Sequence, residues 1–155
     1  MKSQEKQLLD CPPTNNDAGI PLLATGVQVT AAQLRELSPT ALAYLGDAVY
    51  ELYIRSYYLH PPKRSQTYHR LVVAQVRAET QALHLLSLTP HLNNTELEIV
   101  RRGRNATSGR SRRIEPEVYQ QATSLETLMG YLYLTDRERL HQLLQVLKLE
   151  PNLEE

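Results

Sequence analysis

The segment LAYLGDAVYELYIRSYYL, residues 42–59, restricts the possible fold of this chain more than any other feature. It is apolar along most of its length, yet it carries three charged residues, Asp47, Glu51 and Arg55, at intervals of four. Residues four apart lie on one face of an α-helix. The segment therefore predicts a helix that is packed on most sides and has one narrow charged strip. Ser38 and Pro39 would supply its N-cap and its first-turn proline.

The rest of the chain also has a helical pattern. We expect further helices at 30–37, 65–88, 93–103, 116–134 and 136–147. Thr95 and Glu98 have the spacing of a capping box for the third of these. The short runs VQV and LVVAQV would suit strands, but alternating runs are too few for a sheet. The sequence therefore predicts an all-α fold.

A chain of 155 residues is long enough for one domain with its own core. We expect a flexible N-terminal arm over 1–27, rich in proline, asparagine and glycine, a domain over 28–150 and a C-terminal tail over 151–155. One cysteine, no secretory signal and no apolar run near the ~18 residues of a membrane span favour a cytoplasmic protein without a membrane partner. Seventeen basic and seventeen acidic residues balance, so net charge predicts no partner.

Two acids stand in apolar helical segments, Asp47 in the first and Glu126 in the stretch QATSLETLMGYLYL. An ionised carboxylate in such surroundings is costly unless it is paired or binds a metal. Together the two would offer oxygen ligands from different helices, which suits Mg²⁺, and Gly46 would allow another group to approach closely. The alternatives are a glutamate at a helix edge facing water and, for Glu51 and Arg55, an exposed ion pair along the helix. The five histidines form no zinc-binding pattern.

Positive charge is concentrated in RRGRNATSGRSRR, residues 101–113, which holds six arginines and no acid. Arginine binds phosphate in a bidentate manner, so this loop favours nucleic acid over the alternative of a solvated basic loop. It has no aromatic residue for stacking on single strands, which makes a duplex the better match. The candidate RNA-binding residues are Arg101, Arg102, Arg104, Asn105, Arg110, Arg112 and Arg113.

Three motifs in the same order, LAYLGDAVYE, IVRRGRNATSG and ATSLETLMGYLYL, resemble the ribonuclease III family, in particular its mini-ribonuclease III branch, over about residues 33–148. The resemblance implies an all-α endonuclease domain that forms a homodimer and cleaves double-stranded RNA with Mg²⁺, for which Mn²⁺ could substitute. It assigns Asp47 and Glu126 to catalysis and metal binding, Tyr44 to the dimer interface and the arginine loop to RNA. Glu51 could orient a water beside Asp47.

By the same resemblance we expect an endoribonuclease that leaves 5′-phosphate and 3′-hydroxyl ends. Its substrate would be the duplexed ends of precursor large-subunit (23S) ribosomal RNA, and ribosomal proteins could assist it. Ala43 and Thr123 stand where larger relatives carry acids, so the alternative is an inactive helical RNA-binding or ribosome-associated protein with the same fold. The chain is also expected to lack a separate double-stranded-RNA-binding domain.

Overall fold

The computed structural model describes residues 28–107 and 113–152, and within these ranges all regular structure is helical. The elements are α1 (Ala31–Glu36), α2 (Pro39–Leu59), α3 (Ser65–Val76), α4 (Ala78–Leu88), the 3-10 helix η1 (Thr89–His91), α5 (Asn94–Asn105), α6 (Pro116–Thr135) and α7 (Arg137–Val146). The expected all-α fold is confirmed. The predicted arm over 1–27 lies outside the described residues. Among the helices that are described, none is long and apolar enough to cross a membrane.

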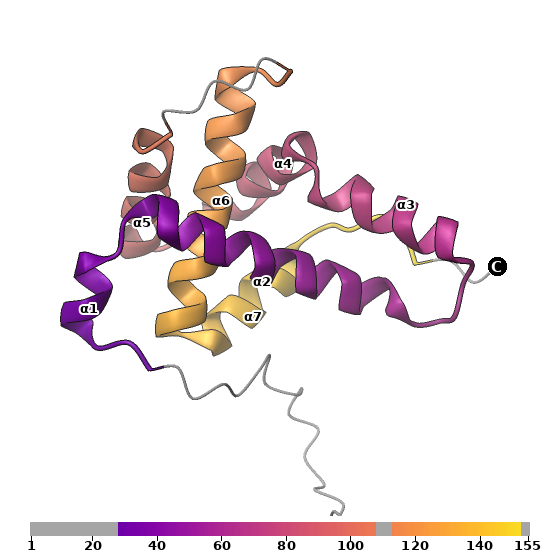
Figure 1. Ribbon diagram of the computed structural model, residues 1–155, viewed down its shortest axis with the longest axis horizontal. Helices are drawn as coiled ribbons and strands as arrows, with labels where there is room; N and C mark the ends of the chain where they lie inside the picture. The colour runs from indigo at the N-terminus through magenta and orange to yellow at the C-terminus, as the bar shows by residue number, and fades with distance from the viewer. Residues whose placement is uncertain (1–27, 108–112, 153–155) are drawn as a thin grey trace, which may run out of the picture.

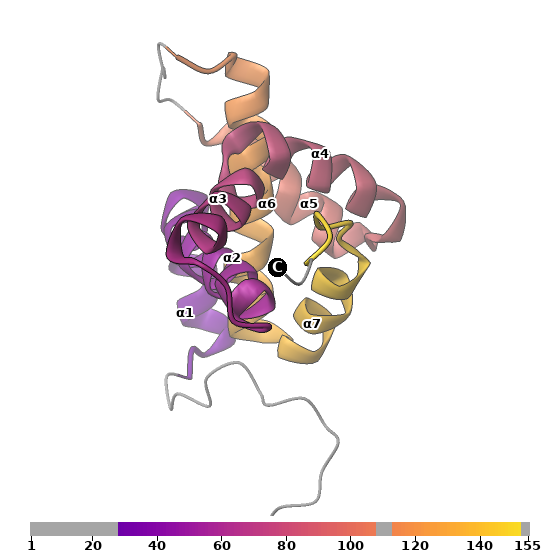
Figure 2. The ribbon, with the colours of Figure 1, turned by 90° about the vertical axis from the view of Figure 1, so that its right-hand side faces the viewer.

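Helix α6 is the centre of the fold. It packs against α2, α4, α5 and α7, with α2 on one side of it and α5 and α7 on the other (Figures 1 and 2). The core consists mainly of fully buried side chains from α2 and α6, which include Tyr50, Ile54, Tyr58, Leu125, Leu128 and Met129. The two helices that carry Asp47 and Glu126 thus share the centre of the molecule.

Helix α2 begins as the sequence predicts. Ser38 is its N-cap, with its Oγ accepting a hydrogen bond from the backbone N–H of Ala41 at 3.1 Å, and Pro39 occupies the first helical position. Residues after α7 return to the far end of α2, where Asn152 Nδ2 donates to the carbonyl oxygens of Tyr57 and His60. Both ends of α2 are therefore held by side chains.

Helices α2 and α6 cross with their backbones in contact, and two glycines make this possible. A Cβ atom on Gly46 would overlap the carbonyl oxygen of Glu126, and a Cβ on Gly130 would overlap the carbonyl oxygen of Leu42. Gly46 thus has the close-approach role that the sequence suggested. Residues beside the glycines, Asp47 among them, lie at the point of closest approach.

The single helix predicted over 65–88 is wrong, because the structure has two helices that meet at Arg77. The backbone of Arg77 is extended (φ −66°, ψ 152°), although neither glycine nor proline marks the break. Side chains from the next helix satisfy two carbonyl groups near the end of α3. Thr80 Oγ1 donates to the carbonyl oxygen of Ala74 at 2.6 Å, and Gln81 Nε2 donates to that of Val76 at 2.9 Å.

The capping box of α5 is formed by other residues than the Thr95 and Glu98 of the prediction. Asn93 is the N-cap, and its side chain accepts from the N–H of Glu96 at 2.9 Å. The Glu96 carboxylate in turn accepts from the N–H of Asn93, also at 2.9 Å. The helix continues to Asn105, two residues beyond the Gly103 at which we expected it to end.

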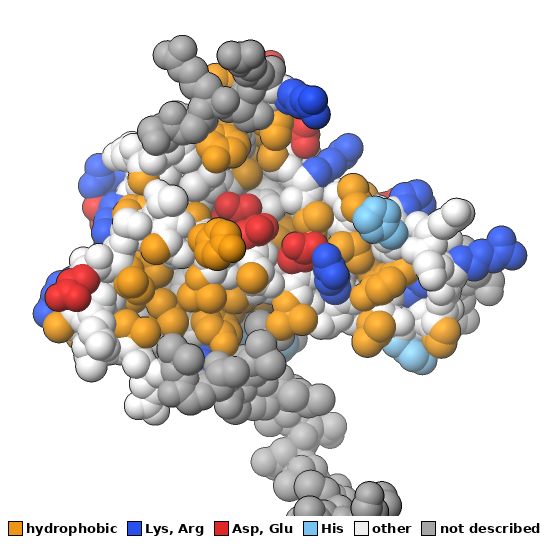
Figure 3. Space-filling view, viewed as in Figure 1, with side chains coloured by type: hydrophobic (Ala, Val, Ile, Leu, Met, Phe, Trp, Pro, Cys, Tyr) orange, Lys and Arg blue, Asp and Glu red, His pale blue; other side chains and the backbone are white. Residues whose placement is uncertain are grey.

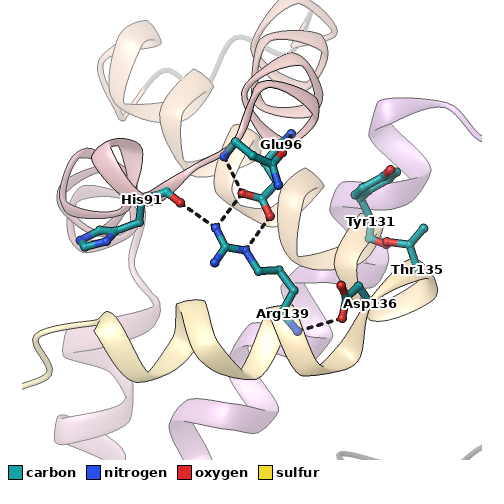
Figure 4. A network of polar contacts seen from close by, with 7 residues as sticks. His91, Glu96, Tyr131, Thr135, Asp136 and Arg139 are labelled. Atoms are coloured by element: carbon teal, nitrogen blue, oxygen red, sulfur yellow. Dashed lines mark hydrogen bonds and ion pairs between the residues drawn. The ribbon is translucent and has the colours of Figure 1, made fainter.

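Glu96 also joins the start of α5 to α7 (Figure 4). Its carboxylate, almost fully buried, accepts from Arg139 Nε at 2.7 Å, while Arg139 also donates to the carbonyl oxygen of His91 at 2.6 Å. The hydrogen bond from Arg139 lowers the pKa of Glu96 and keeps it ionised. Asp136 caps α7 by accepting from the backbone N–H of Arg139 at 2.9 Å.

We predict that Gly46→Ala lowers the free energy of unfolding by about 3 kcal/mol, because the added methyl group must push α2 away from α6. At an open helical position the same change would instead raise stability by about 1 kcal/mol. Urea unfolding followed by circular dichroism measures the difference. As a control, Ala41→Leu on the exposed side of α2 should alter stability by less than about 0.5 kcal/mol. A Gly46→Ala variant as stable as the wild type would contradict the close crossing.

Candidate active site

Asp47 of α2 and Glu126 of α6 meet beside the glycine crossing. Their side chains are close enough to form a hydrogen bond with each other. Asp47 is exposed and Glu126 is half-buried, so the pair can be reached from the solvent. Figure 3 shows acidic side chains near the middle of this face, with hydrophobic side chains beside them. The structure therefore brings together two acids that are 79 residues apart in the sequence.

Burial and neighbouring negative charges raise the pKa values of both acids. Burial, and then the negative charge of Asp47, raise the pKa of Glu126 to about 7, although a hydrogen bond from Gln81 acts in the opposite direction. Burial, and then the charge of Glu51, raise the pKa of Asp47. Near neutral pH, without a bound cation, the pair therefore tends to retain a proton between its oxygens.

The donor set suits a small divalent cation of the Mg²⁺ type. Mg²⁺ is commonly held by one or two carboxylates, and water or substrate phosphate supplies its other ligands. The described residues contain no group of three histidine, cysteine, aspartate or glutamate side chains that could enclose an ion, so Asp47 and Glu126 would be the protein ligands. A buried oxygen near them, Gln81 Oε1, has no hydrogen-bond partner among the described residues. These residues fit an ion that keeps much of its water.

Sequence reasoning missed Gln81, although a signal for it was present. Gln81 lies on the same face of α4 as Leu85 and Leu88, four and seven residues later, and all three are buried. A glutamine on an apolar helical face has to find a polar partner. The sequence did not show which helix α4 would pack against, because its position depends on the break at Arg77.

Glu51 lies one turn after Asp47, and its charge contributes to the raised pKa of Asp47. It also forms the ion pair along the helix that the sequence allowed, with Arg55 Nη2 at 2.6 Å from its Oε1. Ala43 and Thr123, the two positions on which the alternative of an inactive protein rests, lie four residues before Asp47 and three before Glu126. Ala43 is buried and Thr123 is half-buried, so neither position adds a charge to the pair.

The basic residues of the sequence prediction differ in their exposure to solvent. Arg101 pairs with Glu98 at 2.6 Å. Arg104 and Asn105, in the last turn of α5, are exposed, as is Arg113 ahead of α6, whereas Arg102 is half-buried. Arg110 and Arg112 lie outside the described residues.

The end of α5 lies against the part of α6 that carries Glu126. A Cβ on Gly103 would collide with the Thr127 side chain, so α5 and α6 are in close contact there. Thr127 directly follows Glu126 in the chain. The basic end of α5 therefore packs on α6 at the residue that follows Glu126.

We predict that the metal-free protein becomes less stable as the pH rises from about 4.5 to about 7, the interval in which the unfolded chain releases the Glu126 proton and the folded protein retains it. Glu126→Gln should remove this loss. In EDTA, its stability should match that of the wild type at pH 5 and exceed it by about 1–3 kcal/mol at pH 8. Urea unfolding at both pH values gives the comparison, with Glu117→Gln at an exposed position of the same helix as the control. A Glu126→Gln effect that does not depend on pH would contradict the raised pKa.

Comparison with known proteins places these features in a family. The model of the ribonuclease III domain matches residues 40–137, from the second residue of α2 to the start of α7, and this range includes both acids. A protein of Synechocystis named mini-ribonuclease 3 is 59% identical over 119 residues, which cover 77% of this chain and 83% of the relative. A protein of Clostridium tetani with the same name is 35% identical over 133 residues, 84% of this chain and 87% of the relative.

A solved structure supports the same assignment. The crystal structure of a protein from Fusobacterium nucleatum superposes with a TM-score of 0.68 at 32% sequence identity, and the match covers 72% of this chain and 93% of that chain. The fold, the family model and the named relatives agree. The chain belongs to the ribonuclease III family, in its mini-ribonuclease 3 branch, and is an endoribonuclease.

Proposed function

We propose that this endoribonuclease hydrolyses double-stranded RNA in a Mg²⁺-dependent reaction that leaves 5′-phosphate and 3′-hydroxyl ends. The observation that carries the proposal is the contact between Asp47 and Glu126, which come from two core helices and meet at an accessible surface. A divalent ion held there would supply an activated water and would offset the negative charge that develops on the scissile phosphate. Mn²⁺ would be an adequate substitute.

The protein's part in this reaction is to hold two oxygen ligands in fixed positions. Gly46 holds the backbone beside Asp47 against the backbone of Glu126, so the two ligands project from backbones that core packing keeps together. Glu126 has to lose its proton before it can act as a ligand, since metal and proton compete for a carboxylate. Glu51, one turn after Asp47, would orient a water through Oε2, because both of its hydrogen bonds with Arg55 are made by Oε1.

RNA would be held by the basic residues at the end of α5 and in the loop that follows. Exposed Arg104, Asn105 and Arg113 are the described candidates, and Arg110 and Arg112 belong to the same proposed surface. Arg101 and Arg102 would take part to a smaller extent, because one is paired with Glu98 and the other is half-buried. Contacts of this kind bind the phosphate backbone and carry no base sequence information.

We also propose a homodimer in which Tyr44 contacts the partner subunit. Tyr44 is 87% exposed, although it lies near the start of the apolar segment 42–59. It is three residues before Asp47, on the side of α2 that adjoins the acids. Large aromatic side chains are common anchors at protein interfaces. A dimer formed through this face would place two acidic pairs near one RNA duplex.

The choice of RNA is a further part of the proposal. We infer from the family resemblance that the enzyme matures the duplexed ends of precursor 23S ribosomal RNA in the cytoplasm, with assistance from ribosomal proteins. Incubation with a precursor 23S transcript, with and without ribosomal proteins, tests this. Cleavage of unrelated duplexes at an equal rate under both conditions would refute the specific substrate and leave the general activity intact.

We predict that Asp47→Asn lowers the cleavage rate of a hairpin RNA by about 10³-fold or more, because several kcal/mol of transition-state stabilisation depend on the bound ion. The circular dichroism spectrum and RNA binding in EDTA should remain close to those of the wild type. Gel-based cleavage assays with Mg²⁺ and with EDTA measure the effect, and Glu117→Gln serves as the control. Wild-type protein that binds the hairpin but does not cut it with Mg²⁺ would favour the alternative of an inactive RNA-binding protein.

Replacement of Arg110, Arg112 and Arg113 by alanine is expected to weaken RNA binding and to flatten its salt dependence. For each phosphate that the variant no longer neutralises, the slope of log K against log salt should become shallower by about 0.7–0.9. Fluorescence anisotropy at several salt concentrations measures the slope. A triple variant at Arg35, Arg64 and Arg70, which removes the same charge elsewhere, is the control. If both triple variants had equal slopes, the loop would not be the RNA-binding surface.

Tyr44→Ala should weaken the dimer by at least about 2 kcal/mol, about thirtyfold in the dissociation constant, as expected for a central aromatic anchor. Sedimentation velocity over a range of protein concentrations gives the monomer–dimer constant. Tyr57→Ala, at a half-exposed tyrosine near the other end of α2, is the matched control. A monomeric wild type, or a Tyr44→Ala dimer of unchanged affinity, would refute the proposed interface.

A further inference from the structure

Gln81 combines deep burial with an unpaired acceptor. Its side chain is 2% exposed and lies on the buried face of α4. Its Nε2 donates to the carbonyl oxygen of Val76 at 2.9 Å, and its carboxamide also hydrogen-bonds Glu126. Its Oε1 has no hydrogen-bond partner among the described residues. One side chain thus links the break between α3 and α4 to the acidic pair.

An unpaired buried oxygen has to be explained. Leaving a buried acceptor unsatisfied costs about 1–3 kcal/mol, and native cores contain few of them. The need to satisfy the carbonyl of Val76 accounts for the amide nitrogen but not for the oxygen. A ligand that brings a donor to this place would account for the oxygen as well.

The orientation of the carboxamide is set by its neighbours. If the nitrogen and oxygen were exchanged, Oε1 would face the carbonyl oxygen of Val76 and two acceptors would be in contact. The group that remains unpaired is therefore an acceptor, and it needs a donor such as water. The break at Arg77 fixes this position, because it starts α4 with Gln81 one turn inside the helix.

We propose that Gln81 is a positioning residue of the divalent-cation site, holding the Glu126 carboxylate through its amide and accepting a hydrogen bond from a water of the ion's hydration shell through Oε1. This inference rests on the proposed function of Asp47 and Glu126. Two carboxylates fill few of the positions around Mg²⁺, so water must fill others and needs acceptors in the protein. Partners of this outer kind orient the ligands and tune the affinity of metal sites.

The test is Mn²⁺ binding to the RNA-free protein, followed by the electron paramagnetic resonance signal of the free ion. Gln81→Met keeps the length and volume of the side chain but removes the amide. We expect the dissociation constant for Mn²⁺ to rise by about tenfold or more. RNA affinity in EDTA should stay unchanged. The melting temperature of the metal-free protein should change little, because the loss of the hydrogen bond to the Val76 carbonyl is offset by the removal of an unpaired buried oxygen.

Gln75→Met is the matched control. Gln75 is a buried glutamine on α3 that lines a different hollow, with His84, Lys148 and Glu150. This variant should bind Mn²⁺ like the wild type. Gln81→Asn retains the carboxamide but withdraws it by one methylene group, and it should also weaken Mn²⁺ binding, which keeps the test available if Gln81→Met folds poorly.

The possible results distinguish the proposed role of Gln81 from the proposed nuclease function of Asp47 and Glu126. Wild-type Mn²⁺ affinity in a folded Gln81 variant, or an equal loss of affinity in Gln75→Met, would overturn the role of Gln81 and leave the nuclease site standing. A wild-type protein that neither binds Mn²⁺ nor cleaves duplex RNA would overturn both. A loss confined to the Gln81 variants, with RNA affinity in EDTA preserved, would support a positioning role, since a general packing defect would lower both affinities.

Discussion

The contact between the backbones of α2 and α6 at Gly46 and Gly130 is the constraint on which the other features of this molecule depend. Two helices can come this close only where both lack side chains, and here each glycine touches a carbonyl group of the other helix. The close approach lets the short side chain of Asp47 reach Glu126. On another side of α6, Gly103 brings α5 against Thr127. Helix α6 is thus held by α2 on one side and by α5 on another, and both contacts are close to Glu126.

This arrangement sets the electrostatics of the site. Two acids close together, one of them half-buried, repel each other, and no arginine or lysine hydrogen-bonds to either of them in the described residues. Burial of Glu126, and then the charge of Asp47, raise the pKa of Glu126 to about 7. A cation that binds there has to displace the proton, so its apparent affinity should increase with pH up to the pKa of the pair. The packing of α2 against α6 thus keeps two carboxylates close together, where a bound cation would offset their repulsion.

The sequence predicted the features that depend on spacing along one helix and missed those that depend on how helices dock. The Ser38–Pro39 start of α2 and the exposed Glu51–Arg55 pair could be predicted because both are local. The break at Arg77 could not, since its freed carbonyls are satisfied by side chains further along the chain. The cap of α5 was misplaced by two residues because Asn93 and Thr95 are both good N-cap residues followed by a glutamate three positions later. The contact of Glu96 with Arg139 of α7 favours the cap at Asn93.

Two glutamates show how one residue type serves two purposes in the same small core. Glu96 is almost fully buried and pairs with the guanidinium of Arg139. The hydrogen bond from Arg139 lowers the pKa of Glu96, and the positive charge of Arg139 balances the negative charge of the carboxylate. Glu126 meets a glutamine instead. An amide can hold a carboxylate in place without cancelling its charge, whereas an arginine at position 81 would occupy the carboxylate and repel a divalent ion. The choice of an uncharged partner therefore separates a carboxylate that ties two helices together from one that is kept available for a ligand.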